Sequence, residues 1–167
     1  YHIGVSDAMV QLLISRGFNP QKLFSIYNGV AFPPEKPSLS RGEYLESLGV
    51  SYDEDTVVFG IAARLNPVKD IATLIRGFAG ACRKCPNIRL VIAGDGEERQ
   101  MLESLAKETC PAGSVVFAGW VKDTDSFYHA IDVNMLTSLS EGAPYALVEG
   151  ARMRCATIAT SVGGIPY

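Results

Sequence analysis

Short runs of β-branched and aliphatic residues alternate with helical patterns through most of the chain, and this alternation constrains the fold more than any other feature. Helices are predicted between the runs because apolar residues recur at helical spacing, as in Ile71, Leu74 and Phe78. Strands joined through helices need crossover connections, which give a mostly parallel sheet covered on both faces. The sequence therefore predicts a doubly wound, Rossmann-like α/β domain, with buried strands at 57–62, 88–93, 115–118, 132–136 and 156–160.

The predicted helices take their limits from caps and helix breakers. Pro144 marks the opening of a helix that runs to about Arg154. The helix after the second strand is expected to turn Met101, Leu102 and Leu105 toward the core. Two shorter helices are predicted at 42–49 and 125–130.

The first 36 residues differ from the rest of the chain. They read as strand, helix, strand and proline-rich linker, with Ser6 or Asp7 as the helix cap, the strands at 3–6 and 23–27, and the linker at 32–40. We interpret residues 1–36 as the remnant of a preceding domain with its linker, or as an extra unit on this one. Residues 37–167 form the main domain, which is predicted to be truncated because the chain ends where another helix is expected.

Charge and cysteine content argue against several classes of protein. The net charge is −3 and the basic residues are scattered, so no nucleic-acid surface is predicted. No apolar run is long enough to span a membrane, and no signal peptide is visible. Cys82 and Cys85 have CxxC spacing but end a helix, and no cysteine or histidine has zinc-ligand spacing. The thiols are predicted to be incidental, mostly buried and unpaired, which favours a reducing, cytoplasmic location.

The main candidate ligand site lies where the fourth predicted strand runs into a helix. Glu141 and Glu149 bracket Gly142 and Pro144, so helix amides can take an anion while both carboxylates accept hydrogen bonds from hydroxyl groups. Glu149 has small and apolar neighbours, and a carboxylate there needs partners such as ribose hydroxyls. The structural alternatives are a partly exposed Glu149 stabilised by the helix dipole and a solvated Glu141.

Two cations follow the first predicted strand, and ligands collect at the carboxyl ends of strands in open sheets. Arg64 offers a planar fork and Lys69 a mobile point charge, which together suit a diphosphate. Both can equally be solvated loop charges. We expect the two cations and the Glu141–Glu149 turn to share one pocket.

The second and third strands end in glycine turns. Gly94 and Gly96 can let a ligand approach the backbone, although a purely structural turn is the favoured interpretation. Gly119, Trp120 and Val121 could border a nucleotide base, with the indole covering it. The alternative for Trp120 is a place in the core.

Taken together, these segments resemble the donor-site signature of retaining glycosyltransferases with the GT-B fold, in glycosyltransferase family 4. The likeness covers nearly the whole chain, with motifs in the family's order at 27–30, 64–69, 91–96, 140–151 and 156–166. It implies the C-terminal half of a GT-B enzyme, in which residues 37–167 bind the nucleotide sugar. Most of the N-terminal acceptor domain would then lie outside the chain.

By this resemblance, Arg64, Lys69 and Glu141 are the catalytic residues: the cations bind the diphosphate and assist its departure, and Glu141 lies against the donor sugar. Glu149 holds the ribose. Further donor contacts are expected from Gly94, Gly96, Gly119, Trp120, Val121, Gly142, Ala143 and Tyr145. No metal or other cofactor is expected, because cations and helix amides supply the electrostatic stabilisation.

The chain departs from the family pattern at a few positions. Asp70 replaces a usual glycine, Ala31 stands where an aspartate is common, and 154–156 replace a Gly-x-Pro turn. Tyr167 takes the place of a common glutamate. We expect these changes to affect loops and hinge contacts more than phosphate binding.

Three functions fit the pattern. The first is transfer of a hexosyl group from a nucleoside diphosphate sugar to an unidentified acceptor, with the fragment itself binding nucleotide but transferring sugar poorly. The family's acceptors include lipid-linked ones, so peripheral membrane association of the full-length protein is compatible with it. The others are a nucleotide-sugar epimerase on the same scaffold and a non-catalytic nucleotide-binding domain.

Overall fold

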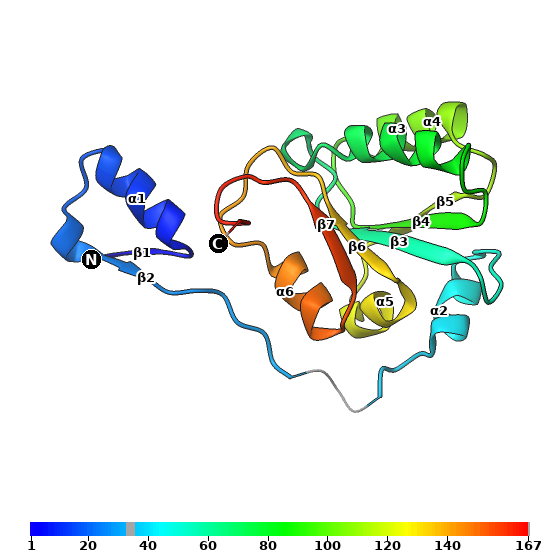
Figure 1. Cartoon of the computed structure of the whole chain (residues 1–167), viewed down its shortest axis with the longest axis horizontal. Helices are drawn as coiled ribbons and strands as arrows, with labels where there is room; N and C mark the ends of the chain where they lie inside the picture. The colour runs from blue at the N-terminus through cyan, green and yellow to red at the C-terminus, as the bar shows by residue number, and fades with distance from the viewer. Residues whose placement is uncertain (33–35, 167) are drawn as a thin grey trace.

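The computed structural model describes residues 1–32 and 36–166, which form two separate parallel sheets (Figure 1). The small sheet pairs β1 (His2–Gly4) with β2 (Leu23–Ser25), and α1 (Asp7–Ser15) and the short 3-10 turn η1 (Pro20–Lys22) connect them. The large sheet has the order β5-β4-β3-β6-β7. Its strands are β3 (Val57–Ala62), β4 (Ile88–Ala93), β5 (Val115–Gly119), β6 (Val133–Leu136) and β7 (Ala156–Ala159).

The helices that accompany the large sheet lie in two layers, one on each face (Figure 1). One layer contains α3 (Ile71–Cys82) and α4 (Arg99–Thr109), and the other contains α2 (Arg41–Ser47), α5 (Thr124–Ala130) and α6 (Tyr145–Arg152). Each layer has its own apolar core, around Ile75 and Leu90 on one face and around Leu45 and Phe127 on the other. The predicted doubly wound α/β fold is confirmed, and the strands begin and end within about two residues of their predicted limits.

One detail of the predicted helices is wrong. Met101 was expected in the core but is 46% exposed, because the buried face of α4 is centred on Leu102 and Ala106. The prediction that Pro144 marks the opening of a helix is confirmed. Pro144 is the N-cap, with φ −70° and ψ 127°, and α6 begins at the next residue.

The thiols were predicted to be mostly buried, but only Cys82 is buried; Cys110 and Cys155 are partly buried and Cys85 is exposed. The predicted linker at 32–40 falls partly outside the described residues, as does Tyr167. Among the described helices, none combines the length and the apolar content needed to cross a lipid bilayer.

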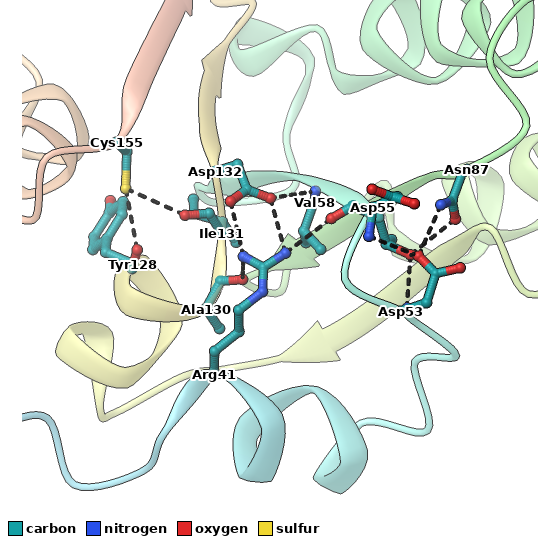
Figure 2. Close-up of polar contacts among 11 residues, drawn as sticks. Arg41, Asp53, Asp55, Val58, Asn87, Tyr128, Ala130, Ile131, Asp132 and Cys155 are labelled. Carbon is teal, nitrogen blue, oxygen red and sulfur yellow. Dashed lines mark hydrogen bonds and ion pairs between the residues drawn. The ribbon is translucent and has the colours of Figure 1, made fainter.

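A polar network fixes the amino ends of the central strands (Figure 2). The Arg41 guanidinium donates two hydrogen bonds, both 2.9 Å long, to the two carboxylate oxygens of Asp132. It also donates to the carbonyls of Ala130 and Thr56, and the Val58 amide donates to Asp132 at 2.7 Å. This bidentate ion pair joins α2 to the beginnings of β3 and β6. The carboxyl ends of these strands, at the opposite edge of the sheet, continue into loops.

Candidate functional site

The order of the strands reverses between β3 and β6, which are neighbours in the sheet but far apart in the sequence. Such a reversal opens a crevice beyond the carboxyl ends of the two strands. Lys69 ends the short 3-10 turn η2 (Pro67–Lys69) after β3, and Glu141 follows β6. Lys69 Nζ lies 2.5 Å from Glu141 Oε1, and the two side chains are only 22% and 10% exposed. The fold thus brings two of the predicted site residues into contact at the reversal point.

Residues just beyond β6 hold this pair in place. The hydroxyl of Ser138, which is fully buried, donates a 2.6 Å hydrogen bond to Glu141 Oε1. The neighbouring Thr137 hydroxyl donates a 3.0 Å hydrogen bond to the backbone carbonyl of Lys69. The loop that carries the cation is therefore joined to the loop that carries the carboxylate.

Asp70, directly after Lys69, has a left-handed backbone with φ 43° and ψ 47°. Glycine adopts this conformation freely, and aspartate is one of the few other residues that tolerate it. The Asp70 carboxylate also accepts a hydrogen bond from the Thr73 amide and caps α3. The departure from the usual glycine therefore preserves the turn that presents Lys69.

Arg64 lies before the η2 turn and lines a pocket. Its side chain is largely exposed and its guanidinium is 3.6 Å from the Glu97 carboxylate. The pocket beside it has a volume of about 470 Å³, and Gly94, Trp120 and Val121 line it as well. Lys69 does not line this pocket, so the expectation that the two cations share one pocket with the Glu141–Glu149 turn is wrong.

The glycines after β4 are required by the packing of two loops. A Cβ atom on Gly94, where φ is 134°, would lie 1.8 Å from the carbonyl oxygen of Ala63. A Cβ atom on Gly96 would lie 2.3 Å from the carbonyl oxygen of Leu65. This contact supports the structural interpretation of the turn, and it positions the backbone of Gly94 in the wall of the Arg64 pocket.

The end of β5 provides the outer wall of the same pocket. Gly119, with φ 68°, accepts a 2.7 Å hydrogen bond from the Gly94 amide at a β-bulge between β4 and β5. Trp120 is 76% exposed, so the alternative that placed it in the core is wrong. A planar aromatic ring at the mouth of an apolar hollow offers a surface on which a flat ring can stack.

The first turn of α6 has no side-chain cap. The residues just before the helix instead contact the segment that follows β2, where the Asn28 side-chain amide donates to the Ala143 carbonyl at 2.6 Å. A Cβ atom on Gly142 would lie 3.0 Å from a methyl group of Val5. Tyr145 is half exposed at the helix start. The uncapped amides of α6 therefore lie beside a hollow of about 180 Å³, which Asn28 and Ala143 line.

Comparison with known proteins identifies the family. The sequence model of the family described as glycosyl transferases group 1 matches residues 49–167. The chain belongs to this family.

Relatives of the chain include an uncharacterized glycosyltransferase of Methanocaldococcus jannaschii, 33% identical over 171 residues, with 98% of this chain and 43% of the relative covered. The UDP-Gal:alpha-D-GlcNAc-diphosphoundecaprenol alpha-1,3-galactosyltransferase of Escherichia coli is 28% identical over 153 residues, or 87% of this chain and 38% of that protein. Anabaena HepE, solved in complex with UDP-glucose, superposes with a TM-score of 0.84 at 25% identity, covering 98% of this chain and 45% of HepE. The chain thus spans less than half the length of these relatives, and its fold matches the C-terminal domain of GT-B glycosyltransferases.

Glu149 is half-buried in α6. It lies close to the buried Tyr128 hydroxyl without the geometry of a hydrogen bond. Burial, and then the negative charge of Glu149, raise the pKa of the Tyr128 phenol, which therefore stays protonated at neutral pH. A protonated phenol beside the carboxylate is a neighbour that the sequence pattern did not indicate.

Ser138 was also missed from the sequence. Its signal was weak: a serine three positions before Glu141 at the end of a strand is common in loops for other reasons. Among the described residues, no group of three or more His, Cys, Asp or Glu side chains is arranged to hold a metal ion.

Proposed function

We propose that the full-length protein transfers a hexosyl group from a nucleoside diphosphate sugar with retention of anomeric configuration, and that this chain is its donor-binding portion. The observation that carries the proposal is the Lys69–Glu141 pair at the strand reversal point, with Nζ and Oε1 2.5 Å apart. A cation and a hydroxyl acceptor at that point suit a ligand that carries both phosphate and sugar. The likeness to HepE, which was solved with UDP-glucose, supports the same ligand class.

In this proposal, Lys69 and Arg64 bind the diphosphate and stabilise the charge that develops on it as the sugar departs. The uncapped amides that follow Gly142 and Ala143, beginning with Tyr145, also bind the diphosphate, and no metal ion is needed. Glu141 accepts hydrogen bonds from the sugar. No cofactor is needed beyond the donor substrate.

The nucleoside takes the larger hollow. Gly94 and Val121, which line this hollow, border the base through their backbone, and Trp120 stacks on it. Gly119, whose carbonyl accepts a hydrogen bond from the Gly94 amide, borders the base as well. Glu149 receives the ribose hydroxyls. Because this hollow opens beside Arg64, the guanidinium reaches the phosphate from the nucleoside side.

Residues 1–36 belong, in the same proposal, to a preceding acceptor domain, and residues 37–167 form the donor domain. The acceptor is then bound mainly by parts of the protein outside this chain, so the chain alone transfers sugar poorly. The full-length enzyme works in the cytoplasm and associates peripherally with the membrane if its acceptor is lipid-linked.

Calorimetric titration with UDP, GDP and ADP tests the proposal. At least one of them should bind, and Lys69→Ala and Arg64→Ala should each weaken that binding by roughly tenfold or more, because a charged hydrogen bond is lost. The matched control is Lys107→Ala in α4, which should leave the affinity unchanged. Absence of binding to all three nucleotides contradicts the proposal, and NMR of the product made by the full-length protein decides between retention and inversion.

A further inference from the structure

The two carboxylate oxygens of Glu141 have different surroundings. Oε1 accepts hydrogen bonds from Lys69 Nζ at 2.5 Å and from Ser138 Oγ at 2.6 Å. Among the described residues, none donates a hydrogen bond to Oε2. One oxygen is thus held by the protein, and the other is free to accept a hydrogen bond from a ligand.

Glu141 lines a small hollow between α1 and the loops that follow β6 and β7. Its other walls come from the N-terminal unit, including Ser6 and Met9, and from Gly163 and Gly164. The volume is about 110 Å³, and a water molecule takes up roughly 30 Å³, so the hollow holds a few waters or the hydroxyl edge of a sugar. A Cβ atom on Gly163 would lie 1.7 Å from the Glu141 carbonyl oxygen, so the backbone of Glu141 is closely packed at this point.

Ser138 is well placed to hold Glu141. It is fully buried just beyond β6, and its backbone carbonyl accepts a 2.6 Å hydrogen bond from the Thr160 hydroxyl beyond β7. The serine is therefore anchored through its backbone to one strand end while its hydroxyl points at the carboxylate. Lys69, in contrast, has a long side chain whose ammonium can change partners by rotating about its bonds.

We infer that Ser138 is a positioning residue, which keeps Glu141 directed at the donor sugar after the diphosphate has drawn Lys69 away. The inference rests on the proposed function. Without a ligand, Lys69 neutralises Glu141; with a diphosphate bound, the ammonium turns to the stronger anion. Ser138 then supplies the remaining hydrogen bond from the protein to Oε1, while Oε2 accepts one from a sugar hydroxyl. Sugar recognition at Glu141 therefore depends on a buried serine that need not touch the ligand.

The test compares two affinities in the same protein. Dissociation constants are measured by calorimetry for UDP and for UDP-glucose, UDP-galactose and UDP-N-acetylglucosamine, using the wild type and Ser138→Ala. In the wild type, one UDP-sugar should bind more tightly than UDP, and the ratio of the two constants measures the contribution of the sugar. Ser138→Ala should reduce this ratio by roughly fivefold or more while it changes the affinity for UDP less than twofold.

The control is Ser104→Ala on α4, where the serine hydroxyl bonds to the Gln100 carbonyl, and this variant should keep both affinities. If Ser138→Ala weakens UDP and UDP-sugar equally, the serine is merely structural and the inference is wrong. An unchanged ratio, or a wild type that binds every UDP-sugar no more tightly than UDP, overturns it as well. Failure of the wild type to bind any nucleotide, with GDP and ADP also tried, removes the proposed function and the inference together.

Discussion

At the scale of single residues, two side chains occupy backbone positions that favour glycine. Asp70 has φ 43° and Arg154 has φ 64°. Arg154 follows the end of α6, where the Cys155 amide bonds to the Gly150 carbonyl and the Arg154 amide to the Ala151 carbonyl, as in a Schellman motif. The Asp70 side chain offsets part of the free-energy cost of its left-handed backbone by capping α3. Position 154 is exposed, and an arginine adopts the left-handed conformation there.

Arg154→Gly should therefore stabilise the chain by about 1 kcal/mol, since the left-handed conformation costs an ordinary residue roughly that amount. Urea unfolding measures the increase in the free energy of unfolding, provided that the slope of this free energy against urea concentration is unchanged. The matched variant is Arg83→Gly at the end of α3, where φ is −67°. It should lower the free energy of unfolding by up to about 1 kcal/mol, because glycine relieves no left-handed conformation there and loses more backbone entropy on folding. Equal effects of the two substitutions would count against this explanation.

At the scale of the secondary-structure elements, the two edges of the large sheet have separate tasks. The amino edge is held by the Arg41–Asp132 ion pair, whose guanidinium also satisfies two backbone carbonyls. The carboxyl edge carries Lys69 and Glu141. Loss of the amino-edge contacts should lower stability without changing the ligand site.

Arg41→Ala tests this separation. It removes four hydrogen bonds of a half-buried guanidinium and should lower the free energy of unfolding by about 1–3 kcal/mol. Arg76→Ala on the exposed face of α3 is the control and should change stability by less than about 0.5 kcal/mol. Under conditions where the protein remains folded, nucleotide affinity should be the same in both variants. A loss of affinity in Arg41→Ala alone would show that the two edges are coupled.

At the scale of the whole molecule, hydrophobic periodicity was sufficient to predict the strands and the parallel sheet, because both depend on local pattern and connection type. The buried face of a helix was harder to predict than its extent. Met101 is next to the buried Leu102 in the sequence, but its own side chain is exposed. The exposure of Trp120 could not be predicted, because a tryptophan at a strand end fits a core equally well.

The candidate site was predictable as a set of residues but not as an arrangement. Lys69 and Glu141 are 72 positions apart, and only the strand order brings them together. Arg64 and Lys69 were expected to share a pocket, yet Arg64 lines the larger hollow while Lys69, at the end of a short 3-10 turn, pairs with Glu141. Ser138 and Tyr128 became visible only through their contacts with Glu141 and Glu149.

We propose that the carboxyl edge of the large sheet binds a nucleoside diphosphate. The most direct measurement is an NMR titration of the ¹⁵N-labelled chain with UDP, GDP or ADP, whichever binds. Binding there should change the shifts of the Lys69 and Gly94 amides and of the Trp120 indole, and leave the amides around Asp132 unchanged. Shift changes confined to the amino edge, or none with any of the three nucleotides, would contradict it.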